Sequence, residues 1–281
     1  MSKTTIALFG AAGKMGTRIT AKLRDDAELE ILYVEAGDAG MTALRDRGLK
    51  ATPGPEAAAA ADILVLAVPD TLIGRVAGEM VPHMRSGTML ICLDPAAPLG
   101  GELPERADVT YLVTHPCHPP IGTDEPTPEA RADYFGGIAR QNIVCALMQG
   151  PEEDYARGED ICRRMFAPVM RAHRITVEQM AMLEPAMAET TVLTLMTAVR
   201  EALDQAIAHG VPEDAARDFL LGHLNVNIGI LFGFIDAEVS DGAKLAVARA
   251  QEIIFKPDWK QVFEPENVIA QVRAITAGTK G

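Results

Sequence analysis

Residues Ile6–Gly16 read IALFGAAGKMG, and this stretch decides the fold that the sequence predicts. Its apolar residues predict a buried strand that ends at Gly10, and the stretch TRITAKLRDD after Gly16 is typical of a helix. Glycines at 10, 13 and 16 would let backbone N–H groups and the positive end of the helix approach a pyrophosphate. The spacing is one residue longer than the G-x-G-x-x-G fingerprint, so a plain tight turn stays the alternative.

The end of the second predicted strand indicates which dinucleotide would bind. Glu35, in LYVEAG, lies 19 positions after Gly16 (35 − 16), where a carboxylate that binds a ribose diol belongs. Such a carboxylate would repel a 2′-phosphate, which favours NAD over NADP. Arg45 and Arg47 leave room for NADP, and a solvated strand end is the other interpretation of Glu35.

Three successive strand ends are predicted to converge on one crevice. LAVPD, CLDPAAP and THPCHPP each complete an apolar run, and ligands of open α/β sheets lie beyond the carboxyl ends of strands. The residues expected to bind the dinucleotide are Gly10, Ala12, Gly13, Lys14, Met15, Gly16, Glu35, Val68, Pro69 and Asp70. His115 and His118 stand where a reacting substrate would lie.

Apolar runs alternate with helical stretches up to about residue 175, which predicts an α/β domain. Most of the runs are continuous, as in parallel strands that helices cover on both faces. From Glu178 onward the pattern is helical. We therefore predict a dinucleotide-binding domain with a doubly wound, mostly parallel sheet over 1–175 and an all-helical domain over 176–281. The predicted strands are Thr5–Phe9, Leu29–Val34, Ile63–Val68, Met89–Leu93, Thr110–Thr114, Ile143–Met148 and Ala172–Val177.

The composition argues against several classes of protein. A net charge of −13 offers no electrostatic basis for binding nucleic acid. The first apolar run is too short for a signal peptide, and no apolar segment reaches the length of a membrane span, about 18 residues. Four widely spaced cysteines without a C-x-x-C pair predict neither a zinc knuckle nor a disulfide framework. We expect a cytoplasmic protein.

The order of these motifs resembles a known superfamily. GAAGKMG, Glu35, LAVPD, CLDPAAP and a strand ending in THP, followed by a helical domain, are similar to the 6-phosphogluconate dehydrogenase-like NAD(P)-dependent dehydrogenases. THPCHPP together with LEPAMAET is more distinctive, and the chain as a whole resembles the D-apionate oxidoisomerase group. The resemblance implies NAD-dependent oxidation of a branched sugar acid at the hydroxyl next to the carboxylate. Migration of the carboxylate would then give 3-oxoisoapionate.

A reaction of this kind implies a base and a cation. A histidine suits removal of the hydroxyl proton, and a divalent cation would stabilise the ketone and alkoxide oxygens together. We expect His115, His118 and Glu184 to be catalytic, with His115 and Glu184 as metal ligands. His118 and Glu189 stay open as further ligands. Each of these residues also has a structural alternative. The histidines could be turn residues, Glu184 a carboxylate at a helix amino terminus, and Glu189 a solvated helix residue.

Two other functions stay open. A simple NAD(P)-dependent 2- or 3-hydroxyacid dehydrogenase would oxidise without rearrangement. A non-catalytic NAD-sensing protein would bind the dinucleotide alone, and the polar strand ends would then serve no purpose.

The expected partners are a small sugar acid and a second copy of the chain. The apolar helices after residue 178 carry more hydrophobic surface than one small domain encloses, which predicts a homodimer formed through them. Neither a nucleic acid nor a membrane is expected as a partner.

Overall fold

The computed structural model describes residues 3–278, which form two compact units. One unit contains the described residues up to Glu184 and those from Ile269 onward, and the other contains Pro185–Val268. The division falls within a π-helix, Met182–Leu193. The domain bounds expected from the sequence, 1–175 and 176–281, stay a prediction.

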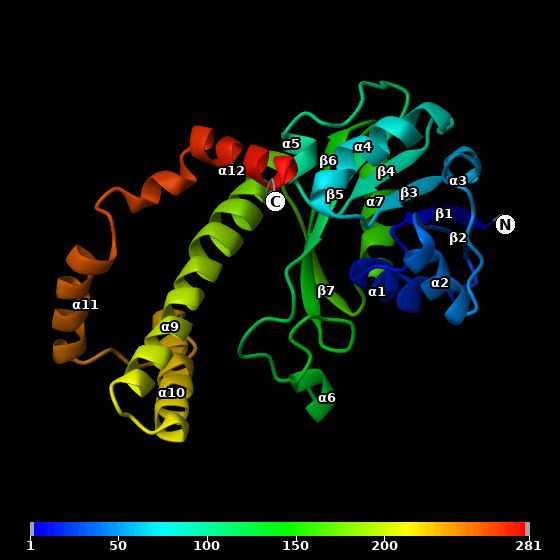
Figure 1. Cartoon of the computed structure of the whole chain (residues 1–281). Helices are drawn as coiled ribbons and strands as arrows, with labels where there is room; N and C mark the ends of the chain where they lie inside the picture. The colour runs from blue at the N-terminus through cyan, green and yellow to red at the C-terminus, as the bar shows by residue number, and fades with distance from the viewer. Residues whose placement is uncertain (1–2, 279–281) are drawn as a thin grey trace. The chain divides into compact units, whose positions relative to one another are not determined.

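A seven-stranded sheet organises the first unit, in the order β2-β1-β3-β4-β5-β6-β7. The strands β1 to β5 are parallel, β6 is antiparallel to β5, and β7 is parallel to β6. Their bounds are β1 Thr4–Phe9, β2 Leu29–Val34, β3 Ile63–Leu66, β4 Met89–Cys92, β5 Thr110–Pro116, β6 Gln141–Gln149 and β7 Val169–Arg174. Figure 1 shows this sheet with helices on both sides, as predicted for an α/β fold.

Apolar side chains of the sheet pack into two separate cores. One core joins the sheet to α3, α4, α5 and α8, and the other joins it to α1, α2 and α7. The helices of the first unit are α1 Lys14–Leu23, α2 Asp38–Asp46, α3 Gly54–Ala60, α4 Asp70–Met80, η1 Val81–His83, α5 Ala96–Leu99, α6 Pro128–Arg131, α7 Asp154–Met165 and α8 Val177–Ala181. Because both faces are covered, β3 and β4 are fully buried, and this explains their continuous apolar sequences.

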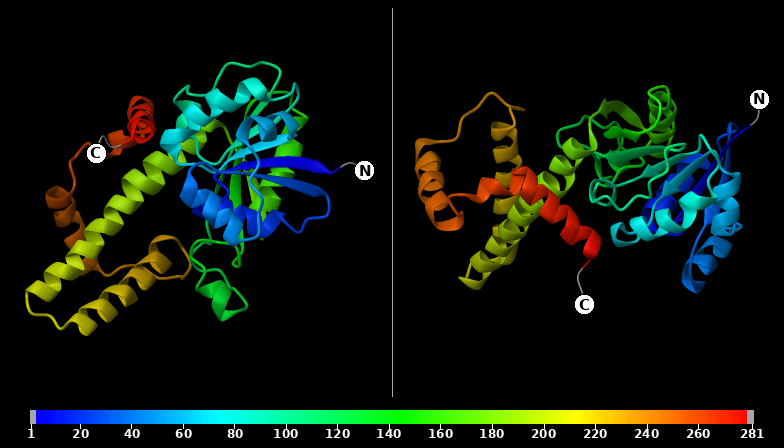
Figure 2. Two further views of the ribbon diagram at one scale, coloured as in Figure 1. Left: turned by 45° about the vertical axis from the view of Figure 1, so that its right-hand side comes forward. Right: turned by 90° about the horizontal axis from the view of Figure 1, so that it is seen from above.

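The second unit is helical in its described residues. After the π-helix η2 come α9 Thr194–Ala208, α10 Glu213–Leu231, α11 Asp241–Ile254 and η3 Trp259–Phe263, and α12 Pro265–Ala277 returns to the first unit from Ile269 onward. Figure 2 shows α9 and α10 as a helical hairpin in two further views. Gly210, at φ +95°, follows the end of α9, and Pro212 immediately precedes α10. No described helix has the length and apolarity needed to cross a bilayer.

Six of the seven strands differ from their predicted bounds by one to three residues at an end, and two of these differences have a clear physical reason. The strand β5 continues through His115 and Pro116, because Pro116 still pairs with Ile143 of β6 and the Cys117 amide donates to the Asn142 carbonyl. The last strand is Val169–Arg174 and not Ala172–Val177. Thr176 forms a capping box with Gln179, so the residue after it begins α8.

Candidate active site

The glycine turn connects β1 to α1. Gly10 has φ +74°, and a Cβ there would lie 2.3 Å from the Ala67 carbonyl oxygen, so only glycine fits. The helix α1 begins at Lys14 after Gly13, and no side chain caps its first N–H groups. Free N–H groups at a helix amino terminus attract an anion. The turn therefore has the geometry predicted for binding a pyrophosphate.

Glu35, directly after β2, points its carboxylate at this turn. Its Oε1 accepts a hydrogen bond from the Ala12 amide at 2.6 Å, and Oε2 accepts one from the Ala36 amide at 3.2 Å. These contacts fix the carboxylate beside the turn, as a ribose-binding group requires. Arg47 donates through Nη1 to the Ala11 carbonyl and to the Thr17 hydroxyl, both at 3.1 Å.

A cavity of about 650 Å³ lies at the carboxyl ends of β1, β2 and β3. The predicted dinucleotide-binding residues that line it are Gly10, Ala12, Gly13, Glu35, Val68 and Pro69. Those outside its lining are Lys14, Met15, Gly16 and Asp70. Gly16 is buried within α1, and Asp70 is the first residue of α4. Six of the ten predicted residues therefore share one cavity.

His115 lies near the end of β5. Alternate residues of a strand point to the same face, so the side chain of His115 lies on the same face as those of Tyr111 and Val113. These two residues pack in the core that α8 covers. The carbonyl of Pro116 can only accept a hydrogen bond, so Nδ1 of His115, 2.9 Å away, carries the proton. The neutral ring therefore presents the Nε2 lone pair.

Glu184 faces that lone pair. Val177 and Met180 of α8 are buried against the sheet, and Glu184 follows Met180 by one helical turn, so it continues on the same side. Its Oε1 lies 3.6 Å from Nε2 of His115. The structure thus brings together the two residues that the sequence analysis assigned to a metal.

Burial shifts the pKa values of both groups toward their neutral forms. It lowers the pKa of His115, although the bond to Pro116 and the charge of Asp70 oppose this effect. Burial also raises the pKa of Glu184, which the neighbouring His118 partly offsets. The separation of 3.6 Å is within reach of an ion pair, but both side chains are at least three-quarters buried, and this burial favours their neutral forms. A lone pair facing a carboxyl group at this distance leaves room for a proton or a cation between them.

His118 occupies the turn after β5 in a strained conformation. Its φ is +59°, the one positive value among the non-glycine residues that the structure describes. Its Nδ1 lies 2.8 Å from the Phe135 carbonyl, and its ring centroid lies 6.1 Å from that of His115. Burial is the largest of the causes that lower its pKa. Glu189 lies in the second unit and stays a prediction as a ligand.

Two residues contribute to this site in ways that were not predicted from the sequence. Asp70, predicted to bind the dinucleotide, interacts electrostatically with both His115 and Glu184. Phe135 contacts His118 from a loop that carries no recognised motif. The sequence feature that could have indicated Phe135 is the segment DYFGG, because its paired glycines at 136 and 137 are typical of an unusual turn.

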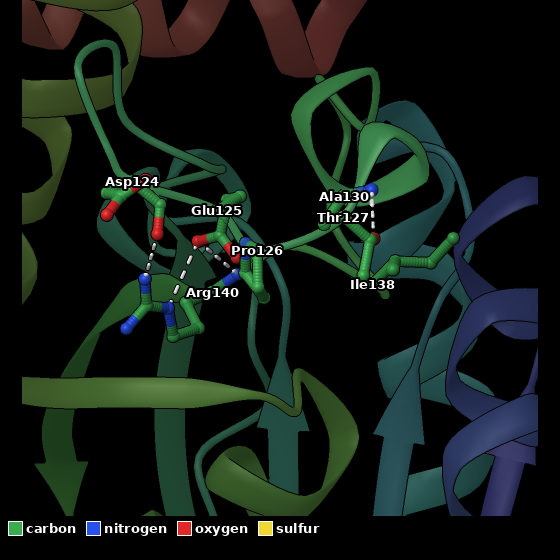
Figure 3. Close-up of a pocket in the computed structure, with 7 residues that line it drawn as sticks. All are labelled: Asp124, Glu125, Pro126, Thr127, Ala130, Ile138 and Arg140. Carbon is green, nitrogen blue, oxygen red and sulfur yellow. Dashed lines mark hydrogen bonds and ion pairs between the residues drawn. The ribbon is translucent and has the colours of Figure 1, made fainter.

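A second cavity, of about 490 Å³, lies in the connection between β5 and β6. In Figure 3 the Arg140 guanidinium points at the Glu125 carboxylate and the Asp124 carbonyl. Glu125 is buried, and its Oε1 accepts from Nε of Arg140 at 3.1 Å and from the Arg140 amide at 3.2 Å. None of the predicted site residues lines this cavity, and the bonds from Arg140 join two parts of the loop between β5 and β6.

The glycine turn, the carboxylate after β2 and the histidines at the end of β5 lie in a dinucleotide-binding fold, and the match to a family model places the chain in the 6-phosphogluconate dehydrogenase-like superfamily. Residues 123–276 match the family model described as phosphogluconate dehydrogenase (decarboxylating), C-terminal. This match covers more than half of the chain.

Full-length relatives define the family more closely. The chain is 50% identical to a D-apionate oxidoisomerase of Rhizobium rhizogenes, over 97% of this chain and all of that protein. It is 45% identical to a D-apionate oxidoisomerase of Cupriavidus necator, over 98% of this chain and all of the relative. The chain belongs to the D-apionate oxidoisomerase family.

A solved structure confirms the fold over the same extent. A protein from Cupriavidus necator, described as a semialdehyde dehydrogenase NAD-binding protein in complex with calcium and NAD, is 45% identical. The match has a TM-score of 0.94 and covers 98% of this chain and all of that one. The predicted fold class and family resemblance are therefore confirmed.

Proposed function

We propose that this chain is an NAD-dependent D-apionate oxidoisomerase. It oxidises the hydroxyl next to the carboxylate of D-apionate to a ketone, and a coupled 1,2-shift of a hydroxymethyl group from the adjacent tertiary carbinol carbon to that ketone carbon gives 3-oxoisoapionate. The carboxylate is already attached to the oxidised carbon, so the group that migrates is the hydroxymethyl group and not the carboxylate expected from the sequence. The observation that carries the proposal is the His115–Glu184 pair at 3.6 Å in the unit that also holds the dinucleotide cavity. Relatives named for this activity, at up to 50% identity over nearly the whole chain, support it.

NAD fits the residues of the cavity. The glycine turn would hold the pyrophosphate, Glu35 would accept hydrogen bonds from the ribose diol, and the exit of β3 would face the second ribose. When bound, NAD supplies the acceptor for the hydride. His118 keeps Nε2 as its free acceptor, because Nδ1 donates to Phe135, so Nε2 would take the proton of the substrate hydroxyl.

A divalent cation fits the pair of donors at His115 and Glu184. Metal–ligand bonds of about 2.0–2.4 Å place two ligands of one cation about 3–3.5 Å apart, close to the observed separation. The described residues contain no group of three or more candidate ligands, so other ligands would complete the coordination. A bound cation would supply Lewis acidity to the substrate's oxygen atoms. The relative crystallised with calcium and NAD supports a cation in the family.

We also propose that the enzyme is a cytoplasmic homodimer. Free thiols at all four cysteines fit a reducing compartment. Large apolar side chains are exposed on the second unit, among them Phe219, Leu231, Phe232, Phe234, Ile253 and Ile254. A second copy of the chain would cover such a surface.

The test is turnover of D-apionate with NAD, followed as NADH formation, with NMR analysis of the product. We expect NADH and a rearranged carbon skeleton in equal amounts. An unrearranged oxo acid would favour the simple 2- or 3-hydroxyacid dehydrogenase. Tight binding of NAD with no turnover of any sugar acid would contradict the enzyme and favour the sensor.

A further inference from the structure

The strained backbone of His118 is held by a loop from elsewhere in the sequence. The carbonyl oxygen of Phe135 accepts a hydrogen bond from Nδ1 of His118 at 2.8 Å, and the ring centroids of the two residues lie 5.1 Å apart. We call residues 133–139 the Phe135 loop. Within it the carboxylate of Asp133 accepts backbone hydrogen bonds from Gly136, Ile138 and Ala139 at 2.7, 2.8 and 3.0 Å. The loop is therefore a defined structure that can fix a neighbouring side chain.

One face of α1 binds this loop. Lys14, Arg18 and Lys22 are spaced by four residues, so they lie on the same side of the helix. Lys14 places Nζ 3.9 Å from the centroid of the Phe135 ring. Lys22 donates from Nζ to the Gly137 carbonyl at 2.7 Å. The helix that follows the glycine turn is thus joined to the loop that holds His118.

Arg18 makes the central contact of this face. Its Nη1 donates to the Phe135 carbonyl at 3.0 Å, so one oxygen accepts from both Arg18 and His118. The residue is only 9% exposed, and Nε and Nη2 find no hydrogen-bond partner among the described residues. Burying a guanidinium with unpaired nitrogens is costly, and the rings of Phe135 and Phe166, 5.1 and 5.6 Å from its Cζ, partly offset that cost.

The loop is also shaped to admit this guanidinium. Gly136 has φ +97°, and a Cβ there would lie 2.5 Å from Nη2 of Arg18. Any side chain at 136 would displace Arg18 from the Phe135 carbonyl. The loop sequence and the arginine therefore fit each other.

We propose that Arg18, acting through the carbonyl of Phe135, sets both the direction and the tautomer of His118. The carbonyl can only accept, so His118 holds its proton on Nδ1 and leaves Nε2 free as long as the carbonyl is kept against Nδ1. Arg18 fixes the carbonyl from its second lone pair. It is a positioning residue, and its importance for turnover rests on the proposed function, in which Nε2 of His118 faces the substrate.

The test compares Arg18→Met with Lys22→Met. Both substitutions remove a cation from the same face of α1 and a donor to the same loop, but only the first touches the Phe135 carbonyl. Histidine ¹⁵N NMR of the substrate-free protein, with His118 assigned by the signal lost in His118→Gln, reads the tautomer. We expect Nδ1–H in the wild type and in Lys22→Met, and a mixture of tautomers in Arg18→Met.

Turnover supplies the second measurement. Arg18→Met should lower kcat about 10- to 100-fold, as loss of a residue that orients a ligand or base does, with the NAD Kd changed less than about twofold. Lys22→Met should stay within about twofold of the wild type in kcat. If Arg18→Met does not fold, Arg18→Lys is assessed in the same way, because it keeps the charge and loses the planar fork.

A folded Arg18 variant whose His118 stays wholly in the Nδ1–H tautomer would overturn the proposal, whatever its activity. A changed tautomer in a protein that oxidises no sugar acid would support the role of Arg18 toward His118 and overturn the proposed function instead. The two ideas therefore fail by different measurements.

Discussion

Glu35 shows how a single carboxylate can serve the turn and the cofactor together. Its hydrogen bond to the Ala12 amide holds it at the glycine turn. Replacing Glu35 by Ser removes the negative charge that would exclude a 2′-phosphate. We expect the NAD/NADP ratio of kcat/KM to fall about 10- to 100-fold, the loss of one charge-assisted hydrogen bond or more. Asp38→Ser is the matched control, because Asp38 is acidic, exposed and outside the cavity lining. An unchanged ratio in Glu35→Ser would remove Glu35 from the site.

His115 and Glu184 are the residues on which the chemistry should depend most. We expect His115→Ala and Glu184→Gln each to lower kcat/KM about 1000-fold or more, because each removes one donor of the pair. The NAD Kd should stay within about threefold, since neither residue lines the dinucleotide cavity. His173→Ala and Glu178→Gln are exposed controls of the same residue types. Full activity in either test variant contradicts the assignment.

Removal of metal tests what lies between those two side chains. A chelator followed by dialysis should reduce activity to less than about a tenth, because the carboxylate and the imidazole would lose the cation that they bind together. An added divalent cation should restore the activity. NAD binding, measured by protein fluorescence, should not change. Metal-free enzyme with full activity would assign His115 the role of a metal-independent base.

At the scale of elements, α8 positions Glu184 by burying apolar side chains against the sheet. Met180 is fully buried and lies one turn before Glu184. Met180→Ala should lower the free energy of unfolding by about 2–4 kcal/mol, since it leaves a cavity, and should lower kcat by displacing Glu184. The measurements are urea unfolding and turnover. Met148→Ala, at a residue 41% exposed on β6, should change stability by less than about 0.5 kcal/mol. Equal effects of the two would show that α8 does not fix Glu184.

Elements were predictable where a local pattern defines them. The continuous apolar runs indicated all seven strands. The stretch after the glycine turn indicated α1, although this helix begins at Lys14, three residues earlier than predicted. The end of β5 was not predictable, because its extension through Pro116 depends on pairing with β6, a segment almost 30 residues away. The π-helix was not predicted either, since Met182–Leu193 carries an ordinary helical pattern. Pro185 lies inside this segment and has no N–H to donate to an α-helical hydrogen bond.

At the scale of the whole molecule, local pattern predicts which residues belong to the site but not how they are held. His115, His118 and Glu184 were chosen from residue type and position, and the structure brings His115 and Glu184 together. Arg18 and Phe135 lie 117 positions apart, and no periodicity connects a helix residue to a loop carbonyl at that separation. Long-range contacts of this kind depend on the packed fold, so a single sequence does not reveal them.

Assembly is the remaining property of the whole chain. Phe232 is 74% exposed and the adjacent Leu231 is 71% exposed at the end of α10, and large contiguous apolar patches are uncommon on the surface of a monomer. If they form a dimer interface, Phe232→Asp should place a charge in an apolar contact and weaken association about 100-fold or more. Light scattering at micromolar concentration should give a dimer for the wild type and a monomer for the variant. Met41→Asp, at a residue 39% exposed on α2 of the other unit, should remain dimeric. A monomeric wild type would contradict the dimer, and a dimeric Phe232→Asp would place its interface on another surface.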